Sequence, residues 1–148
     1  MDKIKIRFKK LSQAARMPYY ASDFAAGADL FAATETSVDI PSGATVAVGT
    51  GIAVEIPAGY VGLVFARSGL ARKQGLAPAN KVGVIDSDYR GEIIVALHNH
   101  STETQTISAG ERIAQIVFIP YLAAEFEESD TLGDTARGEG GFGSTGRK

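Results

Sequence analysis

Two carboxylates stand two residues apart in Asp86–Gly91 (sequence DSDYRG), between the apolar stretches 82–85 and 93–97. In extended chain, residues i and i+2 face the same way, so this pair suits a general base or a metal site. The same residues are also typical of an ordinary hairpin turn, where Asp and Gly are favoured for backbone reasons. Taken alone, the segment leaves both interpretations open.

A second reactive segment is Arg137–Gly146 (RGEGGFGSTG), in which five of ten residues are glycine. It offers backbone N–H groups, a cation, two hydroxyls and one aromatic ring. Its G-x-G-x-x-G spelling is not a dinucleotide motif, because only Arg147 and Lys148 follow where a helix should begin. A P-loop is excluded because no Gly-Lys-Ser/Thr occurs. The segment is therefore either a solvated tail or a lid over a phosphate-bearing ligand.

Three single polar residues have two readings each. Asp29, between a glycine-containing turn and an apolar stretch, can approach a hydrated Mg²⁺ or cap the turn. Ser68 precedes a predicted helical turn and can cradle a phosphate or act as an N-cap; no histidine is placed by sequence to activate it as a nucleophile. Gln115 lies inside an apolar strand, where its amide is either structural or a ligand contact.

His98 and His100 lie on one strand face, but they do not predict a zinc site. Zinc needs a third and usually a fourth protein ligand, and the chain has no other histidine and no cysteine. We interpret them as surface or interface histidines.

Composition narrows the function classes. The chain has 148 residues, a net charge of −2 and no cysteine. One domain with a substantial core is expected, without disulfides and without the broad basic surface of a nonspecific nucleic-acid binder. No apolar run reaches membrane-spanning length and the charged start is not a signal peptide, so we expect a cytoplasmic protein with no membrane or nucleic-acid partner.

The elements that must position these residues are short strands separated by turns. Residues 3–9 alternate charged and apolar side chains, and the stretches 45–48, 60–65, 92–97 and 112–119 are rich in Val, Ile and Phe. Residues 69–75 form the one plausible helical turn. Because no long helix separates the strands, we predict an all-β, distorted antiparallel jelly roll or barrel with one short helix. A compositional break near 127–133 predicts a domain over 1–128, followed by a linker and flexible glycine-rich arm over 129–148.

Five segments in order resemble the motifs of the trimeric dUTPase family. They are Gly27–Leu30, Arg67–Ala71, Gly83–Gly91, Gly110–Gln115 and Arg137–Gly146, which span nearly the whole chain. The chain departs from the usual pattern at Ala28, where a larger residue is common, and at Ala66, where proline is common. Neither position supplies a catalytic side chain.

The resemblance implies a homotrimeric jelly roll that hydrolyses dUTP to dUMP and pyrophosphate. This activity limits uracil incorporation into DNA and supplies dUMP for dTTP synthesis. Asp86 would act as the base that activates a water for attack on the α-phosphorus. Mg²⁺ would be held by the substrate phosphates, and Asp29 would reach it through a water.

The resemblance also implies the substrate contacts, with the arm lent by a neighbouring subunit. Asn80 and Gly83 would belong to a uracil-reading hairpin, Tyr89 would lie beneath the sugar, and Phe142 would stack on uracil. The expected substrate-binding residues are Arg67, Ser68, Gly69, Asn80, Gly83, Tyr89, Gln115, Arg137, Phe142, Gly143, Ser144 and Thr145. Arg67 is also a candidate for a role in the trimer.

Two other functions are compatible with such a chain. A dCTP deaminase shares the fold, but the DSDY segment and the complete glycine-rich tail are features of the hydrolase branch. A noncatalytic nucleotide sensor is the alternative from a different class, since a fold alone does not fix function.

Overall fold

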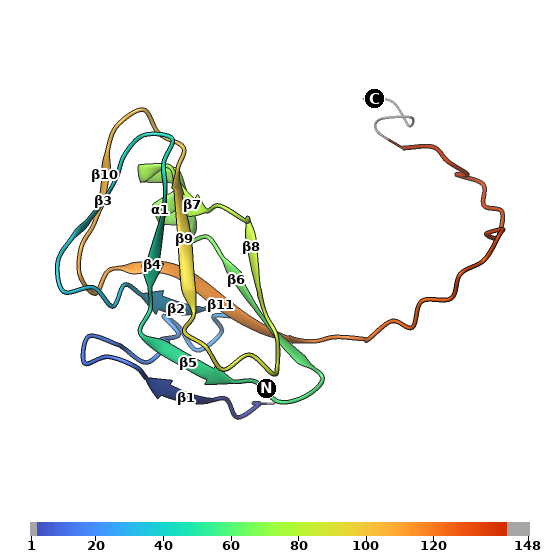
Figure 1. Cartoon of the computed structure of the whole chain (residues 1–148), viewed down its shortest axis with the longest axis horizontal. Coiled ribbons are helices and arrows are strands. Elements are labelled where there is room, and N and C mark those ends of the chain that lie inside the picture. The colour runs from blue at the N-terminus through green and yellow to red at the C-terminus, as the bar shows by residue number, and fades with distance from the viewer. Residues whose placement is uncertain (1–2, 142–148) are drawn as a thin grey trace.

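The computed structural model describes residues 3–141 and contains eleven strands and one short helix in that range (Figure 1). In chain order the elements are β1 (Arg7–Lys10), β2 (Ala28–Phe31), β3 (Val38–Ile40), β4 (Thr45–Gly49), β5 (Ile52–Glu55), β6 (Tyr60–Phe65), α1 (Ser68–Gln74), β7 (Leu76–Pro78), β8 (Val82–Ile85), β9 (Ile94–Asn99), β10 (Gln105–Ile107) and β11 (Arg112–Pro120). No helix among the described residues is long and apolar enough to cross a membrane.

All strand pairings are antiparallel, and they form four small sheets within the described chain instead of one closed barrel. The largest has the order β2-β11-β6-β8, and a second has the order β4-β9-β7. β1 pairs with β5, and β3 pairs with β10. The predicted all-β antiparallel architecture with one short helix is confirmed.

Two predicted strands have different limits in the structure. The expected strand over 3–9 is only β1, whose four residues are all exposed because it pairs with β5 alone. The strand expected from Glu92 begins at Ile94, because Ile93 bonds outside the β9 ladder: its N–H donates to Ile52 and its carbonyl accepts from Thr50. By contrast, β6 has the bounds that the sequence predicted.

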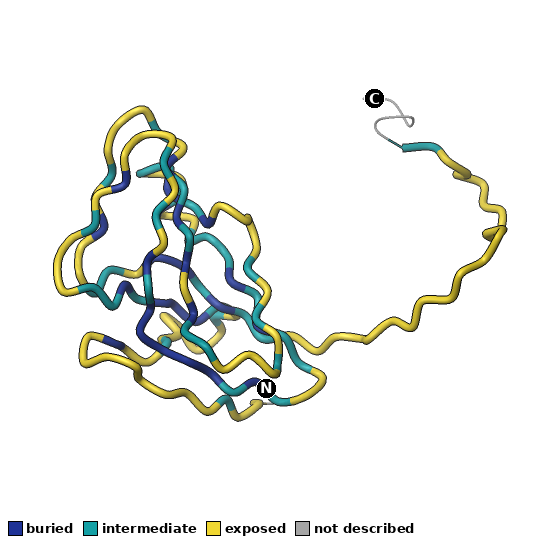
Figure 2. Tube along the Cα trace, viewed as in Figure 1, coloured by how far each residue is buried: buried dark blue, intermediate teal, exposed yellow. Residues whose placement is uncertain are grey.

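The core is built from the inward residues of β2, β5, β9 and β11, and apolar burial of this kind supplies the main driving force for folding. Its fully buried large apolar side chains are Leu30, Ile40, Ile52, Leu76, Ile93, Leu97, Ile107, Ile113, Ile116 and Val48. After β11 the chain changes character, and residues 121–139 are continuously exposed (Figure 2). The expected division into 1–128 and 129–148 remains a prediction.

Asn99 is the main polar residue inside this core, with no exposed surface. Its Nδ2 donates to the carbonyls of Ile40 and Glu103, at 2.8 and 2.7 Å. Its Oδ1 accepts from the backbone N–H and the hydroxyl of Ser101, at 2.9 and 2.7 Å. One side chain therefore ties the end of β9 to β3 and to the loop before β10.

We predict that Asn99→Ala lowers the free energy of unfolding by about 2–4 kcal/mol, because it leaves several buried polar groups without partners. Urea denaturation followed by circular dichroism measures the change. Thr106→Ala is the matched control, since the Thr106 hydroxyl bonds only to Asp39 on the exposed side of β10. A loss for Asn99→Ala no larger than the control's would contradict the assignment.

Candidate functional site

The four-stranded sheet brings several predicted site segments into one transverse row. Gln115 on β11 lies opposite Asp29 on β2 and opposite Phe65 on β6. Phe65 in turn lies opposite Val82, the first residue of β8. Since Arg67 follows β6 by two residues, segments from four distant parts of the sequence meet at this end of the sheet.

Asp29 forms the ionic centre of this row. Its carboxylate is buried and accepts from Arg67 Nε at 2.7 Å and from Arg112 Nη1 at 3.0 Å. Two guanidinium groups around one carboxylate give the cluster a net charge of +1, and Arg112 remains partly exposed. The arrangement holds the arginines in place and leaves a positive surface suited to an anion.

Of the two roles predicted for Gln115, the structure shows the structural one. Its Nε2 donates to the carbonyl of Ala66 at 2.9 Å and so fixes the chain where β6 leads into α1. A Cβ at Gly27 would lie 2.4 Å from the Gln115 Oε1, so a side chain there would displace the amide from its place beside β2. The ligand contact expected of Gln115 stays a prediction.

The start of α1 corrects one interpretation of Ser68. Arg67 is the N-cap and makes no side-chain capping bond, and Ser68 is the first helical residue. The N-cap alternative for Ser68 is therefore wrong. Ser68 and Gly69 are both exposed, next to the arginine cluster, and a Cβ at Gly69 would meet nothing within 4 Å.

Asp86 lies at the other end of β8, one residue after the strand. The segment after it is a turn, as one of the two interpretations predicted, since the Tyr89 N–H donates to the Asp86 carbonyl at 3.2 Å. The Asp86 carboxylate is exposed and joins no ion pair among residues 3–141.

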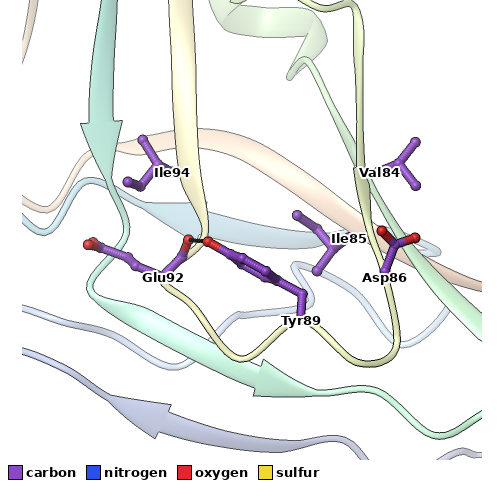
Figure 3. A pocket seen from close by; sticks show the side chains of 6 residues that line it. All are labelled: Val84, Ile85, Asp86, Tyr89, Glu92 and Ile94. Carbon is purple, nitrogen blue, oxygen red and sulfur yellow. Dashed lines mark hydrogen bonds between the residues drawn. The ribbon is translucent and has the colours of Figure 1, made fainter.

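A hollow of about 200 Å³ lies beside this turn (Figure 3). Its lining residues are Val84, Ile85, Asp86, Tyr89, Glu92 and Ile94. Figure 3 shows the Tyr89 ring reaching from the turn toward Glu92, with Asp86 on the opposite side of the ring. An acid and an aromatic face thus border a space bounded by apolar side chains.

Within one chain these two groups of residues are separate. Asp86 follows Val82 by four positions along β8, which is roughly 13 Å at the rise of an extended strand. Arg67 lies beyond the row in the opposite direction, because β6 and β8 are antiparallel. The Asp29–Gln115 row and Asp86 therefore do not meet in a single subunit.

The turn between β7 and β8 holds Asn80, which is exposed, and Gly83 in β8 packs against Val64 on β6. The expected hairpin around Asn80 and Gly83 is wrong for this chain, because β7 pairs with β9 and β8 pairs with β6 in a different sheet. Lys81 has φ of +66°, and among residues 3–141 no other non-glycine residue has a positive φ. Its Nζ lies 3.4 Å from His100 Nε2, so the strained turn is tied to the end of β9. Desolvation lowers the pKa of His100, and the nearby charges of Lys81 and His98 lower it further.

The structure gives the histidines local partners. His98 Nδ1 lies 2.9 Å from the Thr45 hydroxyl, and the two imidazole rings meet edge to face. In the described part of the chain, no group of three or more His, Asp or Glu side chains is arranged to hold a metal ion.

The predicted arm residues are only partly within the described range. Arg137 lies in the exposed segment that leads away from the sheets (Figure 1), and its Nε donates to the carbonyl of Gly140 at 2.7 Å. Phe142, Gly143, Ser144 and Thr145 lie outside the described residues. A single chain therefore does not bring Arg137 to Asp86.

Sequence reasoning missed Arg112 and Glu92. Arg112 is the second partner of Asp29, and Glu92 accepts the Gly51 N–H through its carboxylate at 2.8 Å. The available signals were an arginine three residues before Gln115 on a predicted strand and a lone acid at the start of an apolar stretch. Neither signal names a partner, since the partners lie far away in sequence.

Comparison with known proteins identifies the family. The dUTPase family model matches residues 13–146. A deoxyuridine 5'-triphosphate nucleotidohydrolase of Desulfitobacterium hafniense is 52% identical over 97% of this chain and 96% of its own length. The corresponding protein of Nautilia profundicola is 49% identical over 97% of this chain and all of its own length. The chain belongs to the dUTPase family.

Solved structures agree with this fold. A mutant dUTPase of Staphylococcus bacteriophage 80alpha, determined with dUpNHpp, has a TM-score of 0.89 and 30% identity, covering 97% of this chain and 99% of its own. A mutant dUTPase from phage phi11 of S. aureus, reported with a structural Mg(II) ion, has a TM-score of 0.77 and 27% identity, covering 86% of this chain and 98% of its own. The fold is the jelly roll of the dUTPases, as the sequence predicted.

We predict that Asp29→Asn lowers the free energy of unfolding by about 2–3 kcal/mol, because two guanidinium groups then face each other without a neutralising carboxylate. The loss is below that of a fully buried pair, since Arg112 stays hydrated. Thermal and urea denaturation measure it. Asp39→Asn, at the exposed position of β3, is the matched control, and equal effects for the two variants would contradict the central role of Asp29.

Proposed function

We propose that this protein is a dUTP diphosphatase that hydrolyses dUTP to dUMP and pyrophosphate. The observation that carries the proposal is the row of the four-stranded sheet, which brings the first, second and fourth of the five family-like segments together at Asp29, Arg67 and Gln115, at one positive surface. The names of its relatives point to the same substrate.

Asp86 is the proposed general base. It is exposed, borders the hollow, and is joined to no cation among the described residues, so its oxygens can accept the proton of an attacking water. The hydrogen bond from the Tyr89 N–H to the Asp86 carbonyl fixes the Asp86 backbone and so limits the directions that its carboxylate can take.

The proposed phosphate contacts lie at the positive row. Ser68 and Gly69 offer a hydroxyl and backbone amides next to the Arg67 guanidinium. Gln115, Arg137, Ser144 and Thr145 would complete the contacts, and Gly143 would let the arm approach closely. Fixing the phosphate chain from several sides aligns the α-phosphorus with the attacking water.

The residues fit a Mg²⁺ ion carried by the substrate better than one caged by protein. Both Asp29 oxygens already accept from arginines, but each keeps a lone pair for an ion-bound water. We therefore expect Asp29 to contact the ion only through water. When bound, the ion offsets the phosphate charge that would otherwise repel the nucleophile.

Base and sugar recognition is proposed for the turn between β7 and β8 and for the turn after Asp86. Asn80 and the backbone near Gly83 would hydrogen-bond to the uracil edge, and Tyr89 beneath the sugar would exclude a ribose 2′-hydroxyl. Phe142 would stack on the uracil ring, a contact that contributes about 1–3 kcal/mol in single-strand recognition.

We further propose a homotrimer with shared sites. Within one chain, Asp86 lies roughly 13 Å from the row that contains Asp29. The segment that contains Arg137 leads away from both (Figure 1). Apolar side chains on that segment support a neighbouring surface as its location, since Leu122 and Phe126 are 97% and 96% exposed. One catalytic centre would then draw on several subunits.

Pyrophosphate release from dUTP, dCTP, dTTP and UTP, with Mg²⁺ and with chelator, tests the activity. We predict that Asp86→Asn reduces turnover of dUTP about 10²–10⁴-fold while dUTP binding is largely kept, because only proton transfer is lost. Asp88→Asn, in the same turn, is the matched control. Ammonia release from dCTP would favour the deaminase, and tight dUTP binding without hydrolysis would favour a sensor.

A complementation experiment tests the shared site. We predict that a chain ending at Glu128 still forms trimers but loses most activity, because it lacks Arg137 and the glycine-rich segment. Mixing it with Asp86→Asn chains restores activity, since the first chain supplies Asp86 and the second supplies the arm. With random mixing, about one quarter of the sites regain both parts. A mixture as inactive as its components would contradict sharing.

A further inference from the structure

Glu92 connects the turn after Asp86 to a different part of the fold. Its Oε1 accepts the backbone N–H of Gly51, in the turn between β4 and β5, at 2.8 Å. Its backbone carbonyl accepts the Tyr89 hydroxyl at 2.9 Å. The Tyr89 N–H donates in turn to the Asp86 carbonyl. A continuous chain of hydrogen bonds therefore runs from the β4–β5 turn through Glu92 and Tyr89 to Asp86.

Glycines make room for this connection on both sides. A Cβ at Gly49 would lie 2.5 Å from the Glu92 Oε1, and a Cβ at Gly91 would lie 2.3 Å from the Tyr89 hydroxyl. Gly51, which donates to Glu92, has φ of +65°, a conformation that favours glycine. The backbone thus approaches the Glu92 carboxylate and the Tyr89 ring more closely than any side chain would permit.

The β4–β5 turn to which Glu92 is bonded is itself anchored in the core. The Thr50 hydroxyl donates to the Ile93 carbonyl at 2.6 Å, and the Ile93 N–H donates to Ile52 at 2.9 Å. Thr50 and Ile93 are each 1% exposed. Tyr89 is 44% exposed and lines the hollow, and the bond to the Glu92 carbonyl is the one hydrogen bond that its side chain makes among residues 3–141. Figure 3 shows the Tyr89 hydroxyl directed toward Glu92.

We propose that Glu92 is a positioning residue for sugar discrimination: it holds the Tyr89 ring at the height at which a 2′-hydroxyl does not fit. Without the tether the Tyr89 ring is no longer held against the sugar, and the larger sugar is admitted. The effect falls on the binding of UTP relative to dUTP more than on the proton transfer by Asp86. This role rests on the proposed function, in which Tyr89 lies beneath the sugar.

The test compares kcat/KM for dUTP and UTP in wild type, Glu92→Ala and Glu92→Gln. We expect Glu92→Ala to reduce the dUTP/UTP ratio about tenfold, mainly through a lower KM for UTP, whereas Glu92→Gln keeps the ratio because its amide oxygen still accepts the Gly51 N–H. Glu55→Ala, at the partly exposed end of β5 where Glu55 pairs with Arg7, is the matched control and should leave the ratio unchanged.

Two other substitutions weaken the same tether without changing Glu92. Gly49→Ala displaces the Glu92 carboxylate, and Tyr89→Phe removes the hydroxyl that donates to the Glu92 carbonyl. Both should reduce the ratio in the same direction, even if Glu92→Ala folds poorly. An unchanged ratio in folded Glu92→Ala, or an equal loss in Glu92→Gln, would overturn the proposal. If wild type does not distinguish UTP from dUTP, or if Tyr89→Ala leaves the ratio intact, the proposed sugar site itself fails instead.

Discussion

The pairing of β11 with β2 on one side and β6 on the other is the constraint on which the rest of the site depends. This strand is nine residues long and central in its sheet, so its register fixes both neighbours at once. A shift by one residue would turn Ala114 and Ile116 outward and Gln115 inward. Burial of Ala114 and Ile116 therefore also places Gln115 opposite Asp29, where the arginine cluster forms.

The same register divides the catalytic groups. Antiparallel pairing of β6 with β8 directs the Arg67 side of the site and Asp86 to opposite ends of the sheet. No rearrangement of side chains can close that gap, because it is set by backbone hydrogen bonds. The proposed shared site fits this arrangement of the sheet. It would also give a use to the exposed segment after β11, whose apolar side chains Leu122 and Phe126 are uncovered by the described part of the chain.

Glycine has three different structural uses here, which its frequency in the sequence does not distinguish. Gly51 and Gly75 adopt positive φ in a turn and at the end of α1. Gly27 and Gly49 instead leave space for the polar ends of Gln115 and Glu92. Sequence patterns identify the turn glycines readily, since turn residues cluster locally. The space-making glycines depend on partners far away in sequence and become visible only in the fold.

The sequence by itself determined the architecture and the candidate residues. Short apolar stretches with turn signals predicted antiparallel strands, and β6 has the predicted bounds. It did not determine which groups meet. The pairing of Asp29 with Arg67 and Arg112, and the tether from Glu92 to Gly51, join residues 38, 83 and 41 positions apart. Such contacts are decided by strand register and burial, which depend on the whole chain at once, whereas turns and strand periodicity depend on near neighbours.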